Sequence, residues 1–64
     1  MNMNNFIEVE FTTNGEKCLI NVNNITLITN NGNYCTIYFS GEYNNCTSVN
    51  ETYENLKDLI KKMD

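Results

Sequence analysis

The fold of this protein is decided by a stretch in the middle of the chain, YCTIYFS at residues 34–40. Apolar residues occupy every second position, and successive side chains of an extended strand point to opposite sides. Such alternation predicts a half-buried β-strand. We expect its core side to carry Cys35, Ile37 and Phe39, and its other side to carry Tyr34, Thr36, Tyr38 and Ser40.

Four further segments have strand character, three before this stretch and one after it. They cover residues 5–13, 17–22, 25–30 and 43–49. Asn-Gly pairs at 14–15 and 31–32 readily adopt the positive φ angles of tight turns, so they predict reversals of the chain. The last segment has the weakest strand signal because asparagine is a poor strand former. The first two strands should direct into the core Ile7, Val9, Phe11, Cys18, Ile20 and Val22.

The C-terminal part of the chain is predicted to be an α-helix over about residues 50–63. Ser48 or Thr52 is expected to cap its start, and Ser48 with Glu51 has the spacing of a capping box. Acidic residues stand early in this segment and lysines late, which suits the helix dipole. The apolar residues recur at helical spacing and form one stripe: Tyr53, Leu56, Leu59, Ile60 and Met63.

These elements predict one α+β domain over residues 1–64. We expect a small antiparallel β-sheet or open barrel of about five strands, over about residues 5–49, with the helix covering an apolar face. A chain this short buries only about 60 % of the surface that its unfolded form exposes. Domains of this size usually gain support from disulfides, a metal or oligomerisation.

Oligomerisation is the support that we expect here. Cys18, Cys35 and Cys46 are odd in number and no signal peptide precedes them, which predicts reduced thiols in a cytoplasmic protein. Structural zinc needs four Cys or His ligands, and the sequence has no histidine, so a site shared between subunits is the only metal alternative. We therefore predict a homo-oligomer without cofactors.

Charge and hydropathy each exclude one class of partner. Eight acidic residues against four lysines and no arginine give a net charge of −4. Nucleic-acid binding draws much of its affinity from cations that neutralise phosphates, so we expect no nucleic-acid partner. No segment approaches the roughly 20 apolar residues of a membrane span, so we expect no membrane partner.

Catalysis is not expected. The sequence lacks histidine, the commonest general base. Lys17 is the only cation adjacent to a cysteine, Cys18, and neighbouring strand residues point to opposite faces. Glu8 and Glu10 share a strand face, as a carboxylate dyad would, but a solvated polar face is the favoured explanation for them. The glycines stand in lone turns and form no phosphate-binding loop.

The tyrosines are the main candidates for a binding role. Tyrosine offers a large flat area and a hydroxyl at low entropic cost, and it is enriched at interfaces. The alternative is cross-strand pairing that only stabilises the sheet. With polar residues of the neighbouring loops, the candidate ligand or interface residues are Tyr34, Tyr38, Tyr43, Asn31, Asn33 and Asn44.

Several motifs resemble the small flagellar FlbD-type proteins over residues 6–62. They are FTTNGEK at 11–17, CLIN at 18–21, the isoleucines 25 and 28, TIYFSGE at 36–42 and VNETYENLKDLI at 49–60. The resemblance implies the same architecture and a structural, flagellar accessory role, with no catalytic residues. A second likeness, in the arrangement of short strands, is to LytTR-type DNA-binding domains, and the acidic charge balance opposes it.

Taken together, these features predict a non-enzymatic binding module that binds or sequesters a host protein or a small polar metabolite. The sequence lacks Ala, Pro, Arg, His, Gln and Trp and is rich in Asn, a bias typical of A/T-rich genomes such as those of low-GC bacteria and their phages. In a phage, such a module would be an anti-defence inhibitor or a sponge for a signalling molecule. The alternative function is the flagellar accessory role.

Overall fold

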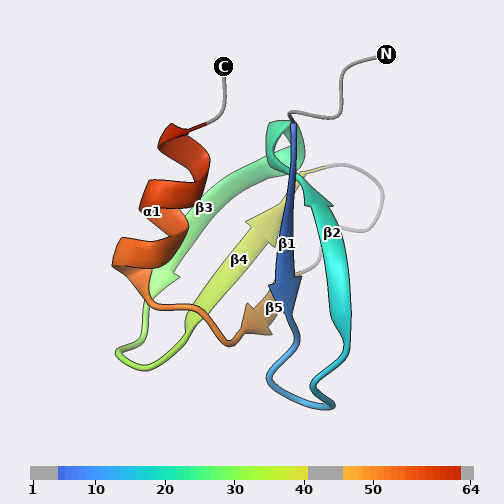
Figure 1. The fold of residues 1–64 in the computed structure, drawn as a ribbon, viewed down its shortest axis with the longest axis vertical. Helices are drawn as coiled ribbons and strands as arrows, with labels where there is room; N and C mark the ends of the chain where they lie inside the picture. Colours follow the sequence, from blue (N-terminus) through green and yellow to red (C-terminus); the bar gives the residue numbers. More distant parts are fainter. Residues whose placement is uncertain (1–4, 41–45, 63–64) are drawn as a thin grey trace.

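The computed structural model describes residues 5–40 and 46–62, and within them the chain forms five strands, a short 3-10 helix and one α-helix (Figure 1). The α+β class predicted from the sequence is confirmed. The elements are β1 (Phe6–Glu10), β2 (Lys17–Asn21), η1 (Val22–Asn24), β3 (Ile25–Asn30), β4 (Cys35–Phe39), β5 (Cys46–Val49) and α1 (Tyr53–Lys61).

All strand pairing is antiparallel and forms two sheets, one of order β1-β2 and one of order β3-β4-β5. The sheets meet where Phe11, just after β1, forms a bridge with Val49 at the end of β5. A backbone hydrogen bond from Asn50 N to Glu10 O, at 2.8 Å, reinforces this junction. Within the described residues β2 and β3 do not pair, so the barrel is open between them.

Both Asn-Gly turns form as expected. Gly15 has a φ of 72° and Gly32 a φ of 95°, the positive region that glycine enters without steric cost. In the first turn Asn14 Oδ1 accepts a hydrogen bond from Glu16 N at 2.9 Å. In the second, Asn30 Oδ1 accepts one from Gly32 N at 3.0 Å. Short polar side chains therefore fix both reversals.

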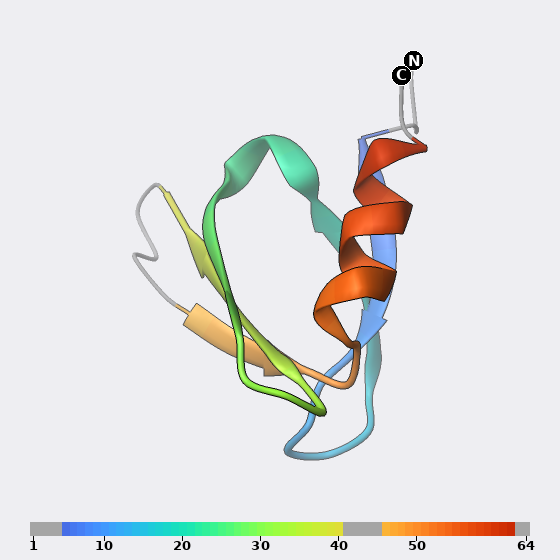
Figure 2. The ribbon, with the colours of Figure 1, turned by 90° about the vertical axis from the view of Figure 1, so that its left-hand side faces the viewer.

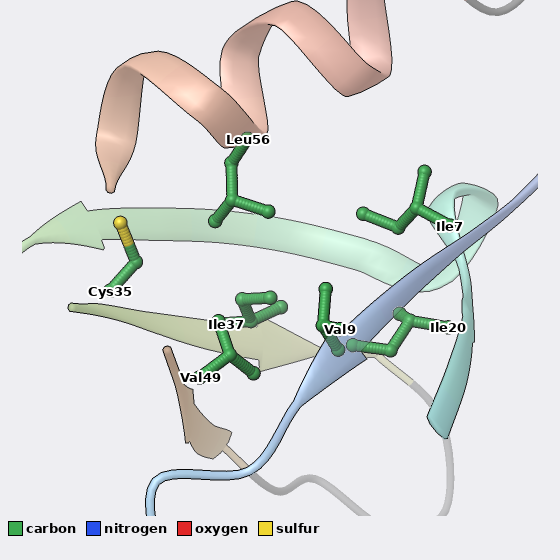
Figure 3. Close-up of a cluster of buried hydrophobic side chains, with 7 residues drawn as sticks. All are labelled: Ile7, Val9, Ile20, Cys35, Ile37, Val49 and Leu56. Atoms are coloured by element: carbon green, nitrogen blue, oxygen red, sulfur yellow. The ribbon is translucent and has the colours of Figure 1, made fainter. Parts of the chain in front are cut away.

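The core lies between the two sheets and the helix (Figure 3). Leu56 reaches into it from α1 and is 1 % exposed, so the helix closes one side of the core. The alternation predicted for the first, second and fourth strands is confirmed, although Phe11, Cys18, Val22 and Phe39 are only partly buried. The buried cluster consists of Ile7, Val9, Ile20, Cys35, Ile37, Val49 and Leu56.

The helix is shorter than expected, and Thr52 is its N-cap. Thr52 Oγ1 accepts a hydrogen bond from Asn55 N at 3.2 Å. The alternative cap, Ser48, is wrong because Ser48 belongs to β5, and its pairing with β4 keeps the chain extended there. Tyr53 of the predicted stripe is 37 % exposed, and Met63 lies outside the described residues.

Candidate binding surface

The three-stranded sheet has an outer face, which points away from the core. We define this outer face by six residues in two rows across the strands. Because directly opposite residues of an antiparallel pair share one side of the sheet, the register fixes both rows. The first row is Leu27, Tyr38 and Cys46, and the second is Thr29, Thr36 and Ser48.

The first row is apolar and exposed. Leu27 is 55 % exposed and Tyr38 38 %, and Cys46 is exposed as well. Antiparallel sheets with one buried face normally turn polar residues to water on the other. An exposed leucine beside a tyrosine and a thiol therefore distinguishes this row from an ordinary solvated face.

The second row is polar but uncharged, and its hydroxyls are linked. The Thr36 and Ser48 hydroxyl oxygens lie 3.3 Å apart, within hydrogen-bonding distance. Asn31 Nδ2 donates to Thr36 Oγ1 at 2.7 Å, so the Asn31 side chain folds over this end of the row. The row thus offers hydroxyl and amide groups in fixed positions.

The structure brings two of the predicted site residues, Tyr38 and Asn31, to the same face of the sheet, around Thr36. Tyr34 precedes β4 and is exposed, and Asn33 is exposed in the preceding turn. Within the described residues, the side chains of Asn33 and Tyr34 form no hydrogen bond with the outer face. Tyr43 and Asn44 lie outside the described residues.

A groove runs between β3 and α1, and we call it the β3–α1 groove. Figure 2 shows the two elements that border it, β3 in green and α1 in orange to red. Its open volume is about 410 Å³. From β3 it is lined by Ile25, Thr26, Leu27 and Ile28, and from α1 by Tyr53, Leu56, Lys57, Ile60 and Lys61.

A second hollow, of about 500 Å³, opens between β2 and the β4–β5 pair. Its walls include Cys18, Leu19 and Phe39. Two of its lining residues, Ser40 and Cys46, flank residues 41–45, which lie outside the described part of the chain.

The half-buried and buried thiols are poor nucleophiles. Burial raises the pKa of the Cys35 thiol, a backbone hydrogen bond with Asn31 partly opposes this rise, and the Glu51 carboxylate adds to it. Burial also raises the pKa of the Cys18 thiol, with a further contribution from the charge of Glu16. Since the thiolate is the reactive form, both side chains stay in the unreactive neutral form near pH 7.

The two carboxylates of β1 have different surroundings. Glu8 is exposed, whereas Glu10 Oε2 accepts a hydrogen bond from Asn50 Nδ2 at 2.9 Å and so belongs to the junction between the sheets. Among residues 5–40 and 46–62, no group of three or more Cys, Asp or Glu side chains is placed to hold a metal ion. In the same part of the chain, no helix has the length and apolar character needed to cross a membrane.

The groove residues were not among those predicted from the sequence. The sequence predicts Tyr53 and Ile60 for the apolar stripe of the helix, and it predicts lysines late in the helix without a binding role. The available signal was the (i, i+4) spacing of the two lysines, which places them on one side of the helix. That this side borders β3 follows only from the tertiary structure.

The chain has no match among protein-family models, curated proteins or solved structures. The resemblance to FlbD-type proteins therefore remains a prediction from the sequence motifs.

Proposed function

We propose that this protein is a non-catalytic binding module that works as an assembly of identical copies, joined through the outer face of the three-stranded sheet. The observation that carries this proposal is the exposed register pair of Leu27 and Tyr38. Leucine beside tyrosine on the sheet face offers the apolar area and the aromatic anchor that interface centres use.

The charge distribution supports self-association through this face. Two copies that each carry a net charge of −4 repel one another, so a contact between them needs a face that adds no further repulsion. None of the six outer-face residues is charged. The hairpin of β1 and β2, by contrast, carries Glu8, Glu10 and Lys17.

The size of the chain supports assembly as well. Only seven residues form the buried apolar cluster of the described part. Burial of apolar surface contributes about 25 cal/mol per Å², so covering the Leu27–Tyr38 row in an assembly would add to the stability of a small core. Binding to a second copy then stabilises the fold by mass action.

The decisive variant is Tyr38→Ser, which removes the aromatic ring from the outer face. Its matched control is Phe6→Ser, because Phe6 is also aromatic, also 38 % exposed, and lies on the other sheet. Sedimentation velocity over a range of concentrations reports the size of the assembly for both variants. We expect Tyr38→Ser to shift the protein toward the monomer at concentrations where Phe6→Ser matches the unmodified protein.

Equal behaviour of the two variants would contradict the proposal, and so would an unmodified protein that is monomeric throughout. Circular dichroism separates loss of assembly from loss of folding. A folded Tyr38→Ser monomer supports an interface role for the tyrosine. A variant that assembles normally but is less stable assigns Tyr38 to cross-strand packing with Leu27.

A further inference from the structure

We propose that the β3–α1 groove binds an extended acidic segment of a partner protein, which adds to β3 as a further strand. The groove shares only Leu27 with the outer face, and this inference goes beyond the assembly proposed above. It follows from three features of the groove, namely a free strand edge, an apolar floor and a local positive charge.

The free strand edge belongs to β3. β3 pairs with β4 on one side only, and within the described residues its other edge has no partner strand. The register is regular from Leu27 to Asn30, after an irregularity between Ile25 and Leu27. An unpaired edge presents backbone N–H and C=O groups that an extended peptide can satisfy.

The floor of the groove is apolar and leads into the core. Leu56 lies at its base and is almost fully buried, while Ile28 and Ile60 are partly buried against the core cluster. Leu27 and Tyr53 at its lips are exposed. A volume of about 410 Å³ lies within the range of small binding pockets, and it suits apolar side chains from alternate positions of an added strand.

The positive charge of the groove favours an acidic partner. Lys57 and Lys61 both line it, and they are two of the four lysines in a chain with a net charge of −4. Among the residues that the structure describes, no acidic one lines this groove. The Lys57 ammonium lies 5.7 Å from the ring centroid of Tyr53, so the two side chains share one lip.

The opposite side of α1 has the reverse character. A third hollow there is lined by Glu8, Glu51 and Asp58 together with Lys62. Lys57 and Lys61 thus line the groove at the free strand edge, whereas three carboxylates line the hollow on the other side of the helix. A segment that alternates apolar and acidic residues complements both the floor and the lip of the β3–α1 groove.

The test is selection of peptides from a displayed random library against the intact protein. We expect the enriched peptides to alternate apolar and acidic residues. In NMR titrations with a synthetic copy of an enriched peptide, the amides of Leu27–Asn30 should shift most. The variant K57Q/K61Q should weaken binding about 2- to 30-fold, because two exposed charge contacts are lost.

The control variant K17Q/K62Q removes the same number of charges from outside the groove, so it should bind the peptide like the unmodified protein. Both variants alter exposed side chains and should fold. The proposal is overturned if no peptide is enriched, if enriched peptides lack acidic residues, or if both double variants bind alike. It is also overturned if K57Q/K61Q dissociates the assembly, because the groove then holds a second copy. A monomeric protein that still binds the peptide contradicts only the proposed assembly.

Discussion

Cys35 on β4 and Val49 on β5 are register partners, and neither exposes any surface to solvent. Val49 also bridges to Phe11, so this pair lies where the two sheets meet. A cysteine at this position acts as a small apolar side chain. Ionisation or modification of the Cys35 thiol should therefore disturb the packing between the two sheets.

The three thiols should react at different rates with an alkylating reagent at neutral pH. In the Tyr38→Ser monomer, where no second copy covers the outer face, Cys46 is exposed and should react first, Cys18 is half-buried and should react more slowly, and Cys35 should react only when the protein opens. Mass spectrometry of peptides after timed labelling measures each rate. Rapid modification of Cys35 in the native protein would place it outside the core.

Stability should decrease with rising pH in the range where thiols ionise. Burial raises the pKa of Cys18 and Cys35 in the folded state, so above about pH 8.5 the unfolded chain loses protons that the folded chain retains. The stability that the raised thiol pKa values contribute is fully present below the thiol pKa of the unfolded chain. It is lost as the pH rises through the thiol pKa values of the folded protein. Urea unfolding at several pH values measures the decrease, which should be smaller in Cys35→Ala. An equal decrease in both proteins would show that Cys35 is not involved.

Ile37→Ala should reduce the free energy of unfolding by about 2–5 kcal/mol, because it leaves a cavity in a core where Ile37 is completely buried. For a small domain this is a large share of the total stability. Ile37→Val is the milder variant and should cost about 0.5–1.5 kcal/mol. Leu19→Ala is the control, since Leu19 is 59 % exposed and should change stability little. Similar losses for Leu19→Ala and Ile37→Ala would indicate that the strand faces are reversed.

Thr52→Ala should cost about 1 kcal/mol and lower the helical signal in circular dichroism, because the Asn55 amide loses its capping acceptor. Thr52→Ser keeps the hydroxyl and should retain most of the stability. Equal values for Thr52→Ala and Thr52→Ser in chemical unfolding would rule out the cap as a source of stability.

Much of the fold could be predicted from local patterns. The alternation in β1 and β4 identified the buried sides, because each side chain there obeys the period of two. β3 is different, since its register shifts between Ile25 and Leu27. Strict alternation places Ile25 and Leu27 on one face, whereas in the structure Ile25 packs against the core and Leu27 is exposed. Periodicity alone therefore could not predict that Leu27 pairs with Tyr38.

The candidate sites were less predictable than the fold. Exposure of Tyr34 and Tyr38 followed from the alternation of one strand. The β3–α1 groove joins side chains about thirty positions apart, such as Leu27 and Lys57, and it exists only because α1 lies beside the free edge of β3. Local sequence carries no information on that arrangement.

The most direct test of the account is native mass spectrometry of the unmodified protein, purified gently and sprayed from a volatile buffer at neutral pH. The account predicts a discrete assembly whose mass is an integer multiple of the chain mass and which Tyr38→Ser shifts toward the single chain. A monomer at every concentration, with the same spectrum for Tyr38→Ser, would contradict assembly through the outer face.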